Sequence, residues 1–417
     1  MKINTLISSA VIAAMTLSGF VQAETFSLWA RSDDSEFMPK LVDAFNAKSK
    51  DKVELQLVPT NEVVQKYAIA AAGGSAPDAL SLDLIYTPAF SQAGQLKDLT
   101  KFAKSLPYYD KLSKAHLSAG TYDGKIYGMP FSGDASVLVW NKDLFKKAGL
   151  DPNKPPKNWA EIRADAKAVS ALGPNTYGYY FSGNCGGCNI FTFMPLVWAS
   201  GGQLLTDGGK KVTVDTPQMK AAIRFYQGMV LDHLVPDGSK TDSGSNFFAA
   251  FAGNNIGISP AGSFAIGALN NQYPNLDYGV TYIPGENGGT SSFAGGDNII
   301  VSAGTSNKKM SAIESFIKFA YSLEGQKILA KNGSLPVRSD IAKQALKGLD
   351  PRYQIAAKAM AEGRTPYTPL FNDLINSTNG PWITMLNRAF FAKNKNEVTK
   401  AIHVAQSKMQ SIVDNAN

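Results

Sequence analysis

The chain has 417 residues, of which 44% are hydrophobic and 18% are charged. Intrinsic disorder requires low hydrophobicity and high charge, so this composition predicts a folded protein long enough for two or three domains. Lysine and arginine exceed aspartate and glutamate, for a formal net charge of +7. No run of lysine or arginine is longer than two residues, so the positive charge is spread over the surface and we expect no nucleic-acid partner.

The N-terminus predicts export. Lys2 is the only charged residue before Glu24, and an apolar stretch from 6 to 21 precedes small residues that end at Ala23. A basic start, a short apolar stretch and small residues at a cleavage site define a secretory signal peptide. We therefore expect residues 1–23 to be removed after Ala23 and the mature protein to lie in the periplasm. No later segment has the roughly 18 uninterrupted apolar residues of a membrane span.

The first part of the mature chain predicts alternating strands and helices. Strands are expected at 25–30, 53–57 and 79–84, with helices at 37–45 and 62–72 between them. This alternation gives a parallel sheet with crossover helices, and ligands of such sheets bind beyond the carboxyl ends of the strands. The residues that follow the first and third strand ends are Arg31, Ser32, Asp33, Asp83 and Tyr86.

The rest of the chain continues the α/β pattern. Strands are expected at 137–140 and 256–259, and helices at 142–148, 159–172, 218–231, 247–253, 312–323, 325–331, 385–391 and 397–412. No internal repeat, low-complexity tract or flexible linker interrupts this pattern. The sequence therefore favours lobes joined by several short crossings over separate domains in series.

Both cysteines, Cys185 and Cys188, lie in a Cys-Gly-Gly-Cys motif. In an oxidising compartment we expect them to form a disulfide that pins a glycine-rich loop. A redox-active pair is the first alternative, but such pairs lie at the start of a helix, whereas residues 182–184 and Asn189 predict a loop. Zinc is the second alternative, although a structural zinc site wants four ligands and the sequence has no second Cys/His pair.

The sequence lacks the motifs of common enzymes. The histidines lie far apart without metal-ligand spacing, and no nucleophile elbow, phosphate-binding loop or dinucleotide fingerprint is present. The polar and aromatic residues beyond the strand ends are instead what sugar binding needs, because polar groups satisfy hydroxyls and aromatic rings cover C–H faces. We expect no catalytic residue, no metal and no cofactor. A secreted glycosidase stays open as an alternative, because the acids of any chain offer carboxylate pairs.

Six segments, in this order and spacing, resemble the periplasmic sugar-binding proteins of ABC importers, a family that includes maltodextrin-binding and trehalose/maltose-binding proteins. They are GSAPDALSLD at 74–83, YDGKIYGMP at 122–130, LVWNKDLF at 138–145, WASGG at 198–202, GGDN at 295–298 and GSLPVR at 333–338. The resemblance covers nearly the whole mature chain. Each segment is unspecific alone, and their order makes the resemblance specific.

The resemblance implies an α/β, two-lobe periplasmic binding protein fold with hinge crossings and an interlobe cleft. The lobes would be 24–131 with 296–334, and 135–293 with 338–417. The crossings would lie near Ser132–Asp134, Ala294–Gly295 and Leu335–Val337. The resemblance also implies a carbohydrate ligand, a membrane permease as partner and a monomeric receptor.

The resemblance further implies ligand-binding residues. Asp83, Asp134 and Arg338 match family positions, and Gly296 and Asp297 lie at a crossing. One departure is Phe264, at a position where the family usually has a stacking tryptophan. Phenylalanine offers less area than tryptophan and has no N–H donor. The remaining candidates are Arg31, Ser32, Asp33, Tyr86, Asn189, Phe191, Trp198 and Trp382, for which a solvated loop or a core position is the alternative. The two arginines also leave open an acidic or sulfonated sugar, or another anionic solute.

Overall fold

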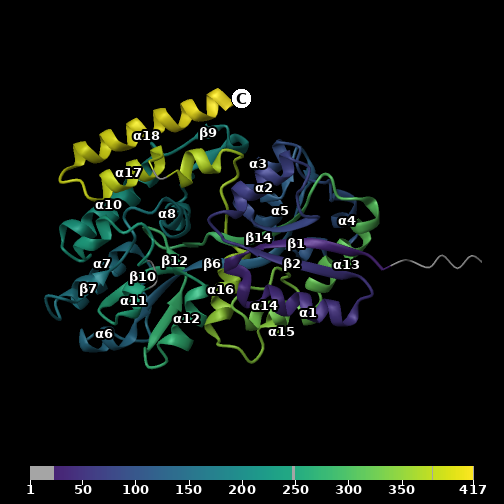
Figure 1. The fold of residues 1–417 in the computed structure, drawn as a ribbon. Helices are drawn as coiled ribbons and strands as arrows, with labels where there is room; N and C mark the ends of the chain where they lie inside the picture. The colour runs from purple at the N-terminus through teal and green to yellow at the C-terminus, as the bar shows by residue number, and fades with distance from the viewer. Residues whose placement is uncertain (1–22, 247–248, 378, 417) are drawn as a thin grey trace, which may run out of the picture.

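The computed structural model describes residues 23–246, 249–377 and 379–416. The predicted signal peptide, apart from Ala23, lies outside the described residues, as do the first two residues of the helix expected at 247–253. Figure 1 shows two groups of helices, with strands running through the centre between them. Among the described residues, no helix has the length and apolar character to cross a bilayer.

The first lobe contains the predicted parallel strands. Strand β1 (Thr25–Arg31) pairs in parallel with β2 (Lys52–Val58) on one side and with β3 (Ala79–Asp83) on the other. Helices α1 (Met38–Lys48) and α2 (Val63–Ala72) connect these strands. The predicted order of these five elements is confirmed. In β1 and α1 the apolar positions are the ones that become buried, whereas Leu57 of β2 is exposed.

Two long strands join the lobes. β6 (Gly128–Asn141) pairs antiparallel with β14 (Ala294–Val301), and β14 also pairs with β3. The main sheet has the order β2-β1-β3-β14-β6-β10-β7, with β11 also paired to β6. The prediction of a strand only at 137–140 was too short, because residues 132–136, which are small or polar, carry no strand signal. Pairing with β14 makes them extended.

The second lobe surrounds the other end of these strands. Its larger elements are β7 (Tyr177–Tyr179), β10 (Ile256–Gly262), β11 (Tyr278–Thr281), α6 (Lys142–Lys147), α7 (Trp159–Ser170), α8 (Gly186–Thr192), α9 (Met194–Ala199), α10 (Pro217–Leu231), α11 (Ala249–Ala252), α12 (Phe264–Gln272), α17 (Pro381–Phe390) and α18 (Lys395–Ala416). Further helices are η1 (Ser32–Glu36), η2 (Leu84–Tyr86), α3 (Thr87–Gln92), α4 (Thr100–Ser105), η3 (Tyr109–Lys111), α5 (Lys114–Ala119), η4 (Asp207–Gly209), η5 (Asp237–Lys240), α13 (Asn307–Ala320), α14 (Leu323–Lys331), α15 (Ala342–Ala345), α16 (Arg352–Ala361) and η6 (Asn372–Asn376). Short hairpins are β4–β5 (Thr121–Tyr122, Lys125–Ile126), β8–β9 (Leu205–Thr206, Lys211–Val212) and β12–β13 (Ile283–Pro284, Thr290–Ser291).

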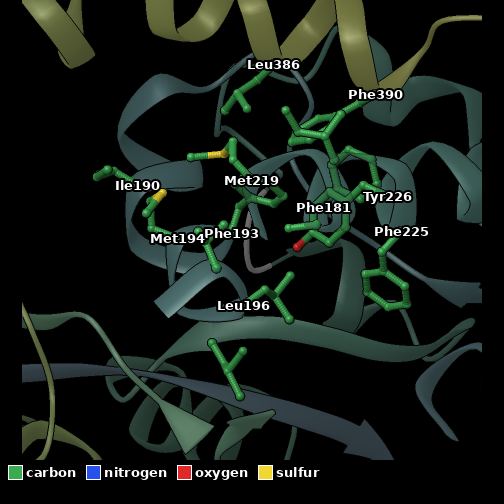
Figure 2. Close-up of a cluster of buried hydrophobic side chains, with 14 of the residues drawn as sticks. Phe181, Ile190, Phe193, Met194, Leu196, Met219, Phe225, Tyr226, Leu386 and Phe390 are labelled. Atoms are coloured by element: carbon green, nitrogen blue, oxygen red, sulfur yellow. The ribbon is translucent and has the colours of Figure 1, made fainter. Parts of the chain in front are cut away.

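The core of the second lobe is aromatic (Figure 2). The rings of Phe181 and Tyr226 stack with centroids 4.3 Å apart, and those of Phe193 and Phe390 meet edge to face at 5.0 Å. Tyr226 lies on α10 and is fully buried. This packing, offset or edge to face, is the arrangement that aromatic pairs prefer, and it fixes α17 against α10.

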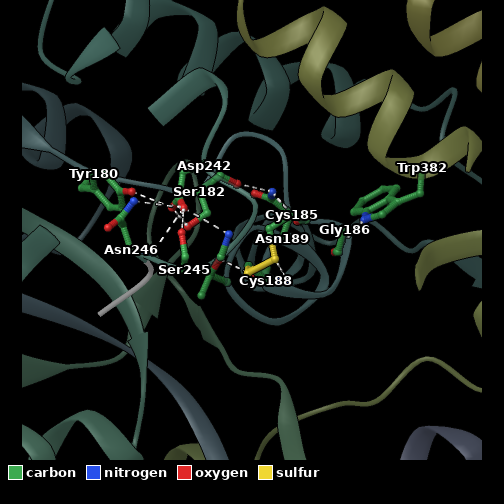
Figure 3. The surroundings of a disulfide bond; sticks show 12 residues. Tyr180, Ser182, Cys185, Gly186, Cys188, Asn189, Asp242, Ser245, Asn246 and Trp382 are labelled. Atoms are coloured by element: carbon green, nitrogen blue, oxygen red, sulfur yellow. Dashed lines mark hydrogen bonds between the residues drawn. A yellow bond between two sulfur atoms is a disulfide. The ribbon is translucent and has the colours of Figure 1, made fainter. Parts of the chain in front are cut away.

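The Cys-Gly-Gly-Cys segment forms a disulfide, as expected, but it is not a loop (Figure 3). Helix α8 begins at Gly186, and Cys185 is its N-cap, with Sγ accepting a hydrogen bond from the Cys188 amide. The predicted loop at Asn189 was wrong, because its side-chain amide donates to the carbonyl oxygens of Ser182 and Cys185. The two hydrogen bonds fix the backbone at the start of α8, where Gly186 and Gly187 alone would leave many conformations accessible.

Candidate functional site

A cleft of about 1170 Å³ lies between the two lobes. Residues of the first lobe, the crossings and the second lobe line it. A ligand in the cleft can therefore touch both lobes at once. Eight of the candidate residues from the sequence line it: Arg31, Asp33, Asp83, Tyr86, Asp134, Phe191, Phe264 and Gly296. The loop ends of β1 and β3 thus reach the cleft, as expected for a parallel sheet.

The floor of the cleft is formed where the crossings lie side by side. Gly296 of β14 pairs with Gly133 of β6, and Gly133 also forms a bridge with Leu335. The Leu335 amide donates to the Gly133 carbonyl over 2.7 Å, and the Gly133 amide donates to Ser334 Oγ over 3.0 Å. The predicted crossings therefore meet at Gly133, where there is no side chain to keep them apart.

Arg31 dominates the electrostatics of the first-lobe wall. Its guanidinium binds Asp297 through two atoms, with Nη2 at 2.7 Å and Nε at 3.1 Å from the carboxylate oxygens. The third nitrogen, Nη1, lies 3.7 Å from Asp83 and 3.6 Å from Asp33. Arg31 is thus held from behind by a buried carboxylate, while its remaining donors face acids at the cleft.

Asp83 of β3 and Asp134 of β6 are desolvated carboxylates on the two strands that flank β14. Asp83 caps η2 by accepting from the Ile85 amide at 3.2 Å. Burial raises the pKa of Asp83 to about 6, against the opposing effect of Arg31. Asp134 accepts hydrogen bonds from the Ala135 amide and from both the amide and hydroxyl of Ser263, and burial raises its pKa as well. Both groups can accept hydrogen bonds from a ligand.

The cleft is negative although the chain is positive. Its lining holds six acids, Asp33, Asp34, Glu36, Asp83, Asp134 and Asp350, and two bases, Arg31 and Lys331. Since Arg31 is already neutralised by Asp297, no excess positive charge remains for an anionic solute. The arrangement suits a ligand that donates several hydrogen bonds and presents apolar faces to Phe191, Phe264 and the neighbouring Phe293.

The other candidate residues do not line the cleft. Asp297 is fully buried behind Arg31, and the side chains of the remaining candidates are held by other protein groups. Ser32 bonds to Thr60, Asn189 to the backbone of Ser182 and Cys185, and Trp382 Nε1 to the Gly186 carbonyl. Trp198 is buried and stacks on Phe293, and Arg338 bonds to Asp340 and stacks on Tyr108 at 3.8 Å.

Several lining residues were absent from the sequence prediction. Phe293 directly precedes the crossing at Ala294, so an aromatic residue beside a predicted hinge was an available signal. Asn376 donates to the Tyr86 hydroxyl at 3.0 Å across the cleft lining. Tyr86 and Asn376 lie far apart in the chain, and no local pattern in the sequence predicts their contact. Cys188 also lines the cleft, so the disulfide belongs to its wall.

Replacing Asp83 by asparagine is expected to stabilise the unliganded protein and to weaken ligand binding. Because the pKa of Asp83 is raised to about 6, folding favours its protonated form. The protonated Asp83 therefore contributes fully to the free energy of unfolding at a pH below the pKa of this side chain in the unfolded chain. The contribution is lost as the pH rises through about 6, its pKa in the folded protein. Asparagine has no charge to desolvate, so the melting temperature of Asp83→Asn should exceed that of the wild type at pH 8 and match it at pH 4. Equal melting temperatures at pH 8 would contradict the desolvation argument.

These features define a two-lobed α/β protein with a cleft between its lobes that can hold a small ligand. The chain belongs to the family described as bacterial extracellular solute-binding proteins, whose sequence profile matches residues 40–361. Membership of this extracellular family implies that the protein is periplasmic or secreted. Among characterised relatives, the diacetylchitobiose binding protein DasA of Streptomyces coelicolor is 28% identical over 392 residues, covering 91% of this chain and 88% of that protein.

Solved structures show the same fold. The sugar-binding protein MalE of Xanthomonas citri matches with a TM-score of 0.80 and 20% identity, over 94% of this chain and 98% of the other. A solute-binding protein of Thermotoga lettingae, solved with α-D-tagatose, matches with a TM-score of 0.78 and 23% identity, over 94% and 100%. The predicted α/β two-lobe architecture is confirmed.

Proposed function

We propose that this protein is the solute-binding component of an ABC importer, and that it captures a sugar in the interlobe cleft and delivers it to a membrane permease. The observation that carries this proposal is the composition of the cleft. Arg31 and Asp83 of one lobe face Asp134 and the phenylalanines Phe191 and Phe264 across the crossings. Such a mixture of charged acceptors, one donor and aromatic faces suits a polyhydroxylated ring.

The energetics are sufficient without any covalent chemistry. A hydrogen bond to a charged group contributes about 1.5–3 kcal/mol, and micromolar binding needs about 8 kcal/mol. A few bonds to Asp83 and Asp134, with one or two aromatic faces, reach that value. Because the ligand touches both lobes only when they close, it stabilises the closed form. The name of the relative DasA supports a carbohydrate ligand.

The negative lining favours a neutral sugar over the alternative of an anionic solute. The location is proposed to be the periplasm, after cleavage behind Ala23, and the receptor is proposed to act as a monomer. We also propose the lobe boundaries 24–131 with 296–334, and 135–293 with 338–417. At the start of the last segment, Arg338 still contacts the first lobe, since it bridges to Leu112 and stacks on Tyr108.

A thermal-shift screen is expected to identify a neutral sugar as the ligand. The panel contains monosaccharides, maltose, N,N′-diacetylchitobiose, polyols and glucuronate. A ligand at a hundredfold excess over its dissociation constant stabilises the native state by about 2.7 kcal/mol, which raises the melting temperature measurably. Calorimetry then gives the affinity, and small-angle scattering gives the decrease in radius on closure.

The control for this screen is a pair of variants. Phe264→Ala removes an aromatic face at the cleft, whereas Leu172→Ala removes an exposed apolar side chain outside its lining. Only the first should weaken binding. If no sugar of the panel raises the melting temperature or changes the scattering radius, the proposal fails. Binding only of glucuronate, with salt-dependent affinity, would favour the anionic alternative, and release of products from a glycoside would favour a glycosidase.

A further inference from the structure

Three buried polar residues lie directly behind the Arg31 wall of the cleft. Asp34 of η1, Ser81 of β3 and Asp297 of β14 have relative exposures of 2%, 0% and 0%. The Ser81 hydroxyl oxygen is 2.9 Å from Asp34 Oδ2 and 2.9 Å from Asp297 Oδ2. This single hydroxyl therefore connects the loop after β1 with the strand that crosses between the lobes.

If both carboxyl groups are ionised, there are too few hydrogen atoms for both of these contacts to be hydrogen bonds. A serine hydroxyl has one hydrogen, and an ionised carboxylate can only accept. Ser81 can thus donate to one of the two oxygens, and its contact with the other would place lone pairs against lone pairs. A proton on one carboxyl group removes this conflict, because that group then donates while Ser81 donates to the second carboxylate.

We infer that Asp34 carries a proton in the folded protein at neutral pH, and that this proton makes Asp34 the residue that positions the Asp297–Arg31 pair behind the cleft. The assignment to Asp34 follows from the ion pair. Arg31 binds Asp297 through two short contacts, while the shortest approach of Arg31 to Asp34 is 3.9 Å. With Asp34 neutral, the Arg31, Asp34 and Asp297 side chains together hold one positive and one negative charge. With Asp34 ionised they would hold an excess negative charge at a buried position.

The surroundings of Asp34 support this assignment. Burial raises the pKa of Asp34 well above its ordinary value, and the negative charge of Asp297 raises it further, while Arg31 opposes both. The charged groups near it are Arg31 of β1, Asp33 and Glu36 of η1, Asp83 of β3 and Asp297 of β14. The charged side chains of the adjacent α1 and β2, such as Lys40, Lys52 and Glu54, are exposed.

Two further titratable groups act on the partners of Asp34. His116 of α5 bonds to the Ser132 carbonyl, and burial lowers its pKa to about 4, so it is neutral near pH 7 and supplies no compensating charge to Asp297. Asp134 of β6 adds negative charge near Asp83. No second cation therefore offsets an ionised Asp34 among the charged neighbours described.

The inferred proton has a consequence for the cleft. While Asp34 is neutral, Asp297 alone holds Arg31, and the Nη1 atom stays between Asp33 and Asp83. Loss of the proton at alkaline pH would add a second carboxylate competing for the same guanidinium. Since the pKa of Asp34 is raised in the folded state, its stabilising contribution is present at low pH and declines as the pH rises.

The test compares the wild type with Asp34→Asn, Asp297→Asn and the control Asp43→Asn, whose side chain is exposed on α1. Asparagine supplies an N–H where the inferred proton lies, so Asp34→Asn should keep the folding equilibrium constant within about threefold at pH 7 and exceed the wild type at pH 9. Asp297→Asn removes the charge that Arg31 needs and should lower it by about 100-fold or more. Urea unfolding at each pH measures these changes.

A spectroscopic measurement provides the second readout. In protein labelled at the aspartate carboxyl carbons, the resonance absent from Asp34→Asn should remain at the protonated position at pH 7. If Asp34→Asn is as unstable as Asp297→Asn, or if the Asp34 resonance lies at the ionised position at pH 7, the inference is overturned. Neither measurement uses a sugar, so their outcome is independent of the proposed function.

Discussion

Replacing Arg31 by methionine is expected to lower the free energy of unfolding by about 3–5 kcal/mol and to abolish ligand binding. Methionine fills similar volume but leaves the Asp297 carboxylate fully buried without its partner. Removing one member of a buried ion pair is costly because the remaining charge keeps its desolvation penalty. Urea unfolding at pH 7 measures the loss, and calorimetry with the sugar found by the screen measures binding.

The control is Arg224→Met, which removes an exposed arginine on α10. Its free energy of unfolding should stay within about 0.5 kcal/mol of the wild type. The loss in Arg31→Met should also shrink as the pH is lowered, because protonation neutralises the carboxyl groups that Arg31 leaves behind. A loss no larger than that of Arg224→Met would show that Arg31 is not the charge that balances the buried acids.

The first-lobe side of the site could be predicted from sequence because its signals are local. Alternating strands and helices give a parallel sheet, and its strand ends carry Arg31, Asp33 and Asp83 to one edge. The structure places these three residues in the cleft lining. Only the residues near each strand were needed for this prediction, since the period of the apolar positions identifies the strand and its last residue.

The rest of the site depends on contacts between distant parts of the chain. Nothing near Asp34 indicates that it would meet Ser81 and Asp297, and nothing near Tyr86 indicates its bond to Asn376. Large aromatic residues such as Trp198 have the same local pattern in a core as in a cleft. Resemblance could suggest which segments matter, but the face that each side chain takes is set by strand register and helix packing.

The crossing strands show why a short pattern can hide an important position. Residues 132–136 are small or polar and predict no strand, yet they extend the strand that pairs with β14 and carry Gly133 and Asp134 into the floor of the cleft. Small residues at this point allow the segments to approach closely. The same property that removes the strand signal from the sequence therefore makes the hinge possible.

Replacing Gly296 by alanine is expected to destabilise the protein by about 2–5 kcal/mol through backbone strain and overpacking. Gly296 has a φ of 108°, a left-handed conformation that side chains disfavour. A Cβ at this position would lie 2.1 Å from the Ser132 carbonyl oxygen and 2.8 Å from its carbon. The clash is with backbone, so relief requires β14 to move away from β6 at the floor of the cleft.

Gly304→Ala is the matched control, because a Cβ there would meet no atom within 4 Å and its φ is not in the left-handed range. Its stability should be unchanged or raised by about 0.4–1 kcal/mol, since alanine restricts the unfolded chain. Urea unfolding compares the two variants, and calorimetry with the identified sugar follows binding. Because Gly296 pairs with Gly133 where the crossings meet, the first variant should also lose affinity. Equal stability of both variants would mean that β14 can shift without cost, and that the pairing at Gly296 does not fix the geometry of the crossings.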